Sequence, residues 1–227
     1  MTSLGQPAAD PAPPFGHLAR VYASLEYAAF GRDLERARFC FLEQLRECRD
    51  ILLLGEGDGR CLARLADLAP GARLHYVDAS SGMLDRAAAR IRPADRSRVT
   101  FICADARSWT PAARSYDAVV TAFFLDCLPP EQVAALVERL RPALRPGAWW
   151  LFTDFILPES GPARWRAQIW LRLMYFFFRW QTGLAVRELP PAEKLLRQGG
   201  WLEQARRDFN GGFVRAALFN LPSGSER

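Results

Sequence analysis

Three alternate glycines form the strongest local pattern in the chain. Gly55, Gly57 and Gly59 lie between an unbroken apolar run at 51–54 and a helical segment at 61–68. Glycines at the carboxyl end of a buried strand let the backbone approach a ligand closely and leave its amide groups free to point at that ligand. A tight turn without a ligand is the plainer alternative, but the order of strand, loop and helix favours a ligand-binding loop.

An NAD(P) fingerprint is the first candidate for such a loop. That fingerprint has a further glycine at its sixth position, where this chain has Arg60. The difference weakens the dinucleotide interpretation without eliminating it, so an NAD(P)-dependent oxidoreductase stays open as an alternative.

Two carboxylates follow the next two apolar runs. Asp78 ends the run at 74–77 and is placed to accept hydrogen bonds from both ribose hydroxyls of an adenosine ligand. Its alternative role is to cap the helix that begins near Ser80. Asp105 follows the run at 99–103, where a carboxylate can accept a hydrogen bond from an adenine amino group. The pattern predicts a nucleoside site at one edge of a sheet.

Apolar strands alternate with amphipathic helices along most of the chain, which is typical of a parallel sheet covered on both faces. The predicted helices are one from Asp33 and those at 61–68, 80–91, 130–144, 162–182 and 192–198. The predicted strands are 51–54, 74–77, 99–103, 118–122, 148–155, 201–209 and 213–220. The turn at 210–212 joins the last two strands as a hairpin. We therefore expect a doubly wound α/β fold with a seven-stranded mixed sheet whose last strand is antiparallel.

The glycine loop and the two acids together resemble the class I S-adenosylmethionine-dependent methyltransferases. The resemblance covers roughly residues 15–220 and implies S-adenosylmethionine as the cofactor. It implies that the loop holds the methionine moiety, that Asp78 binds ribose, that Met83 flanks adenine and that Asp105 contacts the adenine amino group. We include Ala79 and Ala106, which adjoin these acids, in the predicted cofactor site.

One position departs from the family pattern. The family often has an acidic residue two positions before the first glycine, where it helps to hold the amino group of the cofactor, whereas this chain has Leu53. Glu56, between the first two glycines, could supply the missing charge from the loop itself. This hypothesis adds Glu56 to the cofactor-binding residues.

The predicted acceptor site lies beyond the fourth strand, because ligands of open α/β sheets bind outside the carboxyl ends of the strands. Phe123 and Cys127 are its expected substrate-binding residues, although Cys127 also fits a small buried hydrophobe. Asp126 is the candidate base, and a helix cap before Pro129 is its alternative. Tyr22 is a second catalytic candidate if residues 15–48 form an N-terminal lid, and ordinary packing is its alternative.

The helix at 162–182 is apolar on nearly all sides and follows the fifth strand, where this fold commonly places additions that bind the acceptor. We predict that it caps an apolar or aromatic acceptor, with Tyr175 and Arg179 as further substrate-binding residues. A plain core helix, a homodimer interface and contact with a membrane surface are the alternatives. The segments 124–127 and 162–182, with that around Tyr22, make the chain similar to the small-molecule branch that includes the ubiquinone and menaquinone C-methyltransferases.

Composition narrows the remaining classes of function. A length of 227 residues suits one sizeable domain after a flexible leader at 1–14. The net charge of +5 comes from scattered arginines with a single lysine, Lys194, so we do not expect a nucleic-acid partner. Five cysteines without a CxxC pair indicate reduced, buried thiols and a cytoplasmic protein. No cluster has metal-ligand spacing and no stretch fits a transmembrane helix.

The sequence therefore predicts a methyltransferase that acts on a small, hydrophobic or aromatic acceptor. Methyl transfer from a sulfonium needs alignment and exclusion of water more than a fixed catalytic triad. A non-catalytic protein that binds S-adenosylmethionine on the same scaffold is the other alternative, beside the oxidoreductase.

Overall fold

The structure, a computed structural model, describes residues 32–182 and 188–222. From Asp33 onward the described residues belong to one compact unit. The predicted leader at 1–14 and the first part of the predicted lid, up to residue 31, lie outside the described residues, as do the side chains of 173–182.

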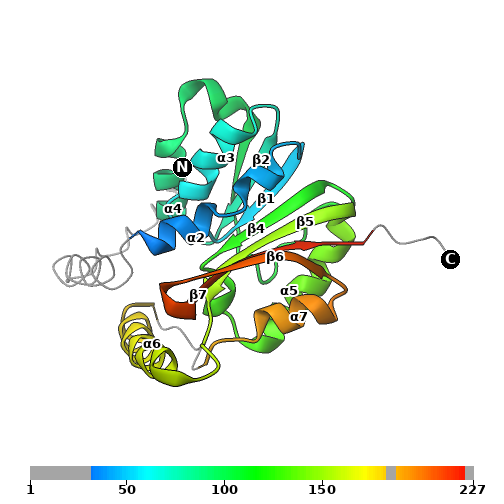
Figure 1. The fold of residues 1–227 in the computed structure, drawn as a ribbon. Helices are drawn as coiled ribbons and strands as arrows, with labels where there is room; N and C mark the ends of the chain where they lie inside the picture. Colours follow the sequence, from blue (N-terminus) through cyan, green and yellow to red (C-terminus); the bar gives the residue numbers. More distant parts are fainter. Residues whose placement is uncertain (1–31, 183–187, 223–227) are drawn as a thin grey trace, which may run out of the picture. The chain divides into compact units, whose positions relative to one another are not determined.

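A seven-stranded sheet in the order β3-β2-β1-β4-β5-β7-β6 forms the centre of this unit (Figure 1). Strands β1 to β5 pair in parallel, and β7 is antiparallel to both of its neighbours. The strands are β1 (Asp50–Leu54), β2 (Arg73–Asp78), β3 (Val99–Cys103), β4 (Tyr116–Ala122), β5 (Leu144–Phe155), β6 (Leu202–Phe209) and β7 (Val214–Asn220). The predicted α/β fold with an antiparallel closing strand is confirmed.

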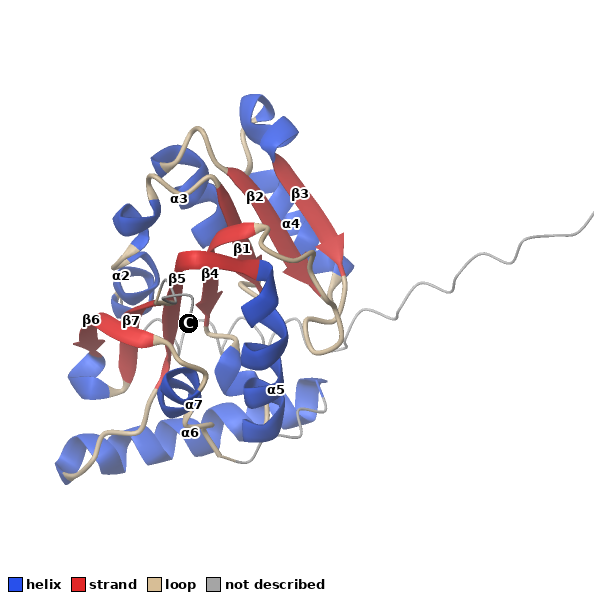
Figure 2. Cartoon of the chain, turned by 90° about the vertical axis from the view of Figure 1, so that its right-hand side faces the viewer, coloured by secondary structure: helices blue, strands red, loops and turns tan. Residues whose placement is uncertain are grey.

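Helices cover both faces of the sheet. Figure 1 shows α3 and α4 on one side of it and α5 and α7 on the other, and Figure 2 shows the same elements from the side. The α-helices are α2 (Asp33–Phe39), α3 (Arg60–Leu68), α4 (Ser81–Arg90), α5 (Pro130–Leu140), α6 (Gly161–Thr182) and α7 (Ala192–Gln198). Short 3-10 turns are η1 (Leu42–Leu45), η2 (Pro93–Arg98), η3 (Leu125–Cys127), η4 (Arg141–Ala143) and η5 (Asn210–Gly212).

Strand β1 shows why its sequence is an unbroken apolar run. Leu52 and Leu54 belong to the core cluster under α5 and α7. Ile51 and Leu53 belong to the cluster under α3 and α4. Because side chains alternate between the two faces of a strand, a strand covered on both sides needs apolar residues at every position.

The helix predicted from Asp33 is short. It ends at Phe39, and the apolar residues Leu42 and Leu45, which follow at helical spacing, are buried in η1. The helix predicted to reach residue 144 ends at Leu140, because Pro142 follows and cannot donate a helical hydrogen bond. The described part of the predicted lid packs as α2 against β6, β7 and α3.

The first half of helix α6, whose side chains the structure describes, buries less of its surface than the prediction required. Ala167 and Leu171 are buried, but Trp165 is 70% exposed and Ile169 is 39% exposed. Arg166 ties the helix to the β6–β7 hairpin through a 3.1 Å hydrogen bond from its Nη2 to the carbonyl of Asn210. In residues 32–182 and 188–222, no helix has both the length and the apolar character needed to cross a membrane.

Candidate functional site

The three glycines of the loop all have left-handed backbone conformations, with φ of +58° at Gly55, +84° at Gly57 and +82° at Gly59. They differ in their surroundings. A Cβ on Gly55 would lie 2.1 Å from the ring of Phe124, and a Cβ on Gly59 would lie 2.6 Å from the backbone of Ala87 on α4. A Cβ on Gly57 would meet no heavy atom within 4 Å. Gly57 therefore borders open space, where backbone amides are accessible to a ligand.

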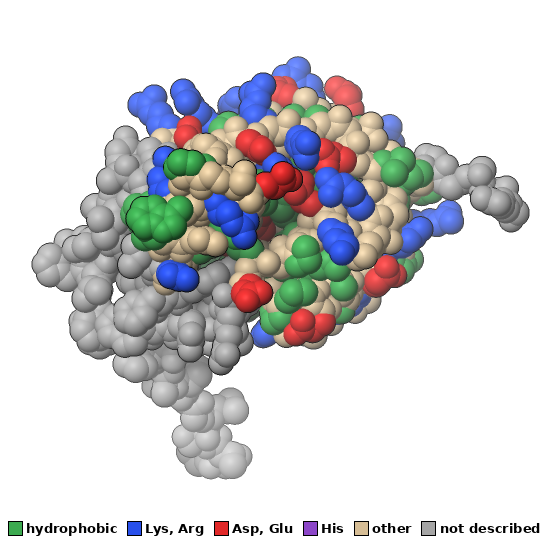
Figure 3. All heavy atoms as spheres, turned by 60° about the horizontal axis from the view of Figure 1, so that its bottom comes forward, with side chains coloured by type: hydrophobic (Ala, Val, Ile, Leu, Met, Phe, Trp, Pro, Cys, Tyr) green, Lys and Arg blue, Asp and Glu red, His purple; other side chains and the backbone are tan. Residues whose placement is uncertain are grey.

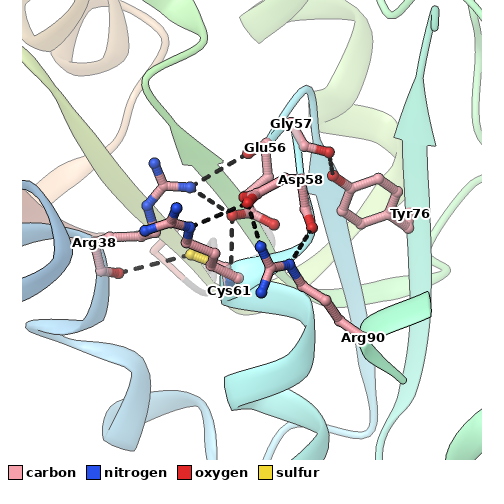
Figure 4. Close-up of polar contacts among 8 residues, drawn as sticks. Arg38, Glu56, Gly57, Asp58, Cys61, Tyr76 and Arg90 are labelled. Atoms are coloured by element: carbon pink, nitrogen blue, oxygen red, sulfur yellow. Dashed lines mark hydrogen bonds and ion pairs between the residues drawn. The ribbon is translucent and has the colours of Figure 1, made fainter. Parts of the chain in front are cut away.

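The loop is held in place by side chains from two neighbouring elements (Figure 4). Tyr76 on β2 donates a 2.6 Å hydrogen bond to the carbonyl of Gly57, and burial raises the pKa of this phenol, which keeps its proton. Arg90 at the end of α4 donates to the carbonyl of Asp58 at 2.7 Å and to its carboxylate at 2.5 Å. These contacts fix the loop before any ligand arrives, so its amide positions cost no ordering on binding.

Asp78 lies beside this loop, as predicted. Its Oδ1 accepts a 2.8 Å hydrogen bond from the backbone amide of Ser80, and the amide of Gly57 also donates to its carboxylate. Ser80 itself caps α4 by accepting from the amide of Met83 at 3.4 Å. Burial raises the pKa of Asp78, although both amides oppose that rise. Asp78 therefore shapes the turn into α4 and still faces the glycine loop.

Asp105 lies at the end of the adjacent strand but in a wetter setting. Register pairs Asp78 with Cys103, so the two acids belong to neighbouring strand ends. Arg107 binds the carboxylate of Asp105 through its Nε and Nη2 at 2.6 to 2.9 Å, which lowers the pKa of this half-exposed acid. Met83 is half-buried in the first turn of α4.

The two alanines of the predicted cofactor set adjoin these acids. The carbonyl of Ala79 lies 3.9 Å from the Cys103 thiol. Ala106 is buried, and its carbonyl accepts a 2.9 Å hydrogen bond from Arg139.

Glu56 lies on the side of the loop that faces α2. Its side chain is fully buried, and its Oε1 accepts from Arg38 at 2.6 Å and from the amide of Cys61 at 3.0 Å. Its Oε2 is buried and has no hydrogen-bond partner among the described residues. Burial raises the pKa of Glu56, and the guanidinium of Arg38 opposes that rise.

Two features fit a site for a nucleoside that carries a charged amino acid group. They are the open space at Gly57 and the unpartnered oxygen of Glu56. The first leaves room for backbone contact, and the second is a buried acceptor that lacks a donor. An unsatisfied buried carboxylate oxygen carries a large desolvation cost, so a ligand donor at this point would be favourable. The residues present therefore fit the cofactor that the sequence implies.

The segment after β4 connects this edge to a second region. Phe123 has a positive φ of +55°, a strained conformation for a phenylalanine. Its ring lies 5.2 Å from the ring of Phe155, and the guanidinium of Arg38 stacks 5.2 Å above it. Phe124 packs against Gly55, as described above, and Asp126 follows in η3. One short segment thus touches the glycine loop, α2 and the end of β5.

Two buried acids meet at the end of this segment. Asp126 is 8% exposed and Asp154, near the end of β5, is 1% exposed. The amide of Asp126 donates a 3.1 Å hydrogen bond to Asp154 Oδ2. Burial raises the pKa of both acids, and the nearby charge of Asp126 adds to the rise at Asp154. Burial therefore favours the protonated form of these carboxyl groups.

This acid pair lines a cavity of about 290 Å³. The apolar part of its wall comes from the end of β5 and the segment before α7, with Phe152, Phe155, Ile156, Leu157, Leu189 and Pro190 among its members. Cys127 lies beside the pair with its thiol 3.4 Å from Asp126 Oδ1, and burial raises the pKa of this thiol, so it stays protonated. Asp126 does not cap α5, because no side chain caps that helix.

Comparison with known proteins supports the predicted resemblance. A family model described as "Methyltransferase domain" matches residues 51–147, from β1 to the start of β5. The match covers less than half of the chain. The predicted resemblance to class I methyltransferases is confirmed by this match together with the strand order.

One curated relative matches part of the chain in sequence. It is a trans-aconitate 2-methyltransferase from Streptomyces avermitilis, 42% identical over 77 residues, which is 34% of this chain and 28% of that protein. The chain therefore matches less than a third of the length of this relative.

Solved structures share the fold of the domain. The N-methyltransferase NodS from Bradyrhizobium japonicum WM9, in complex with S-adenosylhomocysteine, has a TM-score of 0.59 at 18% identity and covers 92% of this chain and 90% of its own. The 1,6-didemethyltoxoflavin-N1-methyltransferase of Burkholderia thailandensis has a TM-score of 0.61 at 18% identity over 96% of this chain and 93% of its own. The comparisons do not favour the oxidoreductase or the non-catalytic alternative, and none singles out the quinone methyltransferases.

Three residues of the candidate site were missed by sequence reasoning. Arg38 binds Glu56, Tyr76 holds Gly57, and Asp154 pairs with Asp126. A tyrosine inside a buried strand beside a glycine loop, and an acid in the otherwise apolar end of β5, were the available signals for the last two. Nothing in the spacing of α2 marks Arg38 among the other arginines.

Three predicted residues cannot be compared with the site. Tyr22 lies outside the described residues, and the side chains of Tyr175 and Arg179 do as well. The prediction of buried thiols is right for Cys61, wrong for the exposed Cys103, and only partly right for Cys40, Cys48 and Cys127, although all five cysteines are free.

Proposed function

We propose that this protein transfers a methyl group from S-adenosylmethionine to a small-molecule acceptor. The observation that carries the proposal is Gly57, whose left-handed backbone borders open space beside Asp78 within a methyltransferase domain. The donor supplies a methyl group bound to a positively charged sulfur, and this charge makes the methyl carbon electrophilic. The protein then has to bind the donor, align the acceptor and exclude water.

The donor side of the proposed site is the edge formed by β1, β2 and β3. Gly55, Gly57 and Gly59 give the loop its shape, and the open space beside Gly57 would admit the ligand. Asp78 would accept the ribose hydroxyls and Asp105 the adenine amino group, with Met83 against the ring. Ala79 and Ala106 would complete the adenosine pocket beside these acids.

The acceptor side of the proposed site is the cavity at the end of β5. Its apolar wall suits a hydrophobic or aromatic molecule, and its volume of about 290 Å³ suits a small one. The acid pair at Asp126 and Asp154 offers such a molecule one hydrogen-bonding point. In its ionised state, Asp126 would accept a proton from an acceptor hydroxyl or amine, because burial has made it a stronger base than an ordinary aspartate.

Five further residues belong to the proposed acceptor side. Phe123 links Arg38 to Phe155, and Cys127 adjoins the acid pair, so both can line the acceptor path. Tyr22, Tyr175 and Arg179 remain predicted contacts of the lid and cap helix. The exposed Trp165 and Ile169 at the start of α6 leave a homodimer or a membrane surface as predicted partners of that helix.

Small-molecule acceptors are also what the names of the relatives describe. One relative is named for trans-aconitate, and one structural neighbour was crystallised with 1,6-didemethyltoxoflavin. Basic and acidic side chains are interspersed on the face shown in Figure 3, which supports the prediction that nucleic acid is not the partner. The five free cysteines support a cytoplasmic location.

A ligand screen followed by an activity screen tests this function. Thermal-shift measurements should show stabilisation by S-adenosylhomocysteine and none by NADH. Incubation with S-adenosylmethionine and a panel of small phenols, amines and carboxylic acids should then release S-adenosylhomocysteine with at least one acceptor. Stabilisation by NADH alone would favour the oxidoreductase, and binding without release for any acceptor would favour the non-catalytic alternative.

A further inference from the structure

An unpaired cation lines the cavity at the end of β5. Lys194 of α7 is one of the residues that form the wall of this cavity of about 290 Å³. It is exposed, and its side chain has no ion pair or hydrogen bond within residues 32–182 and 188–222. It is also the only lysine among the 30 basic residues of the chain. The cavity is therefore bordered by an ammonium group that is free to bind a ligand.

The arginines around Glu193, the chain neighbour of Lys194, are already bound to acids of the protein. Arg197 binds Glu203 and lies 3.7 Å from Glu193 Oε1. Arg215 donates a 2.9 Å hydrogen bond to Glu193 Oε2. A guanidinium has a planar set of donors that matches such carboxylates, whereas an ammonium is a compact point charge with three rotatable donors. Lys194 is thus the cation of this group that stays available.

The acids that line the cavity do not balance the charge of Lys194. Burial raises the pKa of Asp126 and of Asp154, which favours their neutral forms. The carboxylate of Glu193 lies between Arg215 and Arg197, so two cations already oppose its charge. The cavity wall combines apolar side chains, two acids that favour the neutral form and one free cation.

We infer that the acceptor is an amphipathic anion whose charged group binds Lys194. Its apolar or aromatic body lies against the wall of the cavity, and its carboxylate or other anionic group pairs with the ammonium group. The inference rests on the proposed function and adds a charge to the hydrophobic acceptor expected there. It makes Lys194 a specificity-determining residue of the acceptor side.

Binding at two points explains why a single charge at this place matters. Asp126 from η3 and Lys194 from α7 line the same cavity. An acceptor whose hydroxyl or amine reaches Asp126, and whose anionic group reaches Lys194, is held in one orientation, which methyl transfer requires. The cavity is at the small end of the range for ligand sites, so a single ring or a short chain suffices to join the two groups.

Two competing explanations predict a different charge preference. If Lys194 is an ordinary solvated side chain, the charge of a ligand has no effect on its affinity. Glu193 Oε1 is buried and has no hydrogen-bond partner in the part of the chain that the structure describes. If this oxygen takes up a ligand donor, the cavity prefers a cation.

The test uses ligands of similar size and three different charges. Hydroxyphenylacetic acid is an anion, its primary amide is neutral and hydroxyphenylethylamine is a cation. Hydroxybenzoic acid, its amide and hydroxybenzylamine form a second series. Calorimetric titration of protein saturated with S-adenosylhomocysteine measures their binding without turnover. In at least one series the wild-type protein should bind the acid about tenfold more tightly than the amide, and the amine least tightly.

Three variants assign this preference to one side chain. Lys194→Met should bind the acid and the amide with affinities within about twofold of each other, and Lys194→Arg should keep the preference because the charge remains. Arg96→Met is the matched control. Arg96 is exposed, lies in η2 beside β3 and has no ion pair among the described residues, so its loss should leave the preference unchanged. All three changes are at exposed positions and should leave folding intact.

The outcomes separate this inference from the proposed function. If S-adenosylhomocysteine binds but neither acid binds more tightly than its amide, the inference is wrong while the proposed function stands. The inference is equally wrong if Lys194→Met keeps the preference or if the amine binds most tightly. If S-adenosylhomocysteine does not bind, the proposed function fails and the inference fails with it. A preference for the acid that Lys194→Met loses, and that Lys194→Arg and Arg96→Met keep, supports the inference.

Discussion

The donor edge and the acceptor cavity are built in opposite ways. The donor edge is made of backbone: three glycines within five residues, whose conformations are held by Tyr76 and Arg90. The acceptor cavity is made of side chains from three distant segments, namely η3, the end of β5 and the residues from 189 to 197. The first kind of site is fixed by local conformation, and the second depends on packing between remote parts of the chain.

The difference between two glycines gives the largest expected effect. Gly55→Ala should destabilise the protein by about 3 kcal/mol or more, because its Cβ would overlap the ring of Phe124 in addition to the strain of a positive φ. Gly57→Ala should cost only about 1 to 2 kcal/mol, since it meets strain but open space. Urea unfolding measures both. Equal losses would mean that the space beside Gly57 is filled.

A change in the acceptor cavity should lower kcat and leave the affinity for the donor unchanged. Asp126→Asn should lower kcat about a hundredfold with an acceptor found in the screen, because a positioned base contributes on that order. Its affinity for S-adenosylhomocysteine should stay within about twofold of the wild type. A matching fall in donor affinity would show that the acid pair belongs to the donor edge.

The affinity for the donor should also fall when Asp78 loses its charge. Asp78→Asn keeps an oxygen for the amide of Ser80 but loses the charge that favours ribose hydroxyls. Calorimetry should show a loss of about 1 to 3 kcal/mol for both S-adenosylhomocysteine and methylthioadenosine, because both ligands contain the ribose. A loss confined to one ligand would contradict the assignment.

The acid pair should reveal itself in the pH dependence of stability. Burial raises the pKa of Asp154, so the folded protein holds a proton that the unfolded chain releases above about pH 4. This contribution is present at low pH and is lost as pH rises through the folded pKa. Asp154→Asn cannot ionise there, so the wild-type Tm minus the variant Tm should fall as the pH rises above about 4.

Each 1 kcal/mol of that loss corresponds to about 2 to 4 °C in Tm. A difference in Tm that stays constant as the pH rises would argue against a protonated carboxyl group at Asp154. Thermal unfolding in a series of buffers of equal ionic strength measures it.

Asp105 should give the smallest effect of the series. The acid is half-exposed and already bound to Arg107, so an added ligand contact is screened by solvent. Asp105→Asn should weaken S-adenosylhomocysteine binding by less than about 1 kcal/mol. A loss as large as that of Asp78→Asn would mean that Arg107 moves away and leaves Asp105 to the ligand.

The sequence predicted the fold and the donor edge well for a physical reason. Strands covered on both faces need continuous apolar runs, and a left-handed loop needs glycine, so Ile51 to Leu54 and the three glycines carry their structure in their residue types. The acids at Asp78 and Asp105 follow from the register of neighbouring strands.

The remaining contacts depend on tertiary packing that no spacing encodes. Asp154 meets Asp126 only because β5 lies next to β4, and Arg38 meets Glu56 only because α2 packs near the loop. The predicted burial of α6 was wrong for a related reason. Its apolar residues indicated burial on nearly all sides, but at the start of the helix only the side with Ala167 and Leu171 faces the rest of the protein, and Trp165 remains exposed.

One titration tests the central claim most directly, namely that the backbone around Gly57 binds S-adenosylmethionine. Calorimetry with S-adenosylhomocysteine should show saturable binding to the wild-type protein and a loss of at least about a hundredfold in Gly57→Leu, whose side chain would occupy the open space. The variant should remain folded, with a cost of about 1 to 2 kcal/mol for its positive φ. Undiminished binding by the folded variant would contradict the claim.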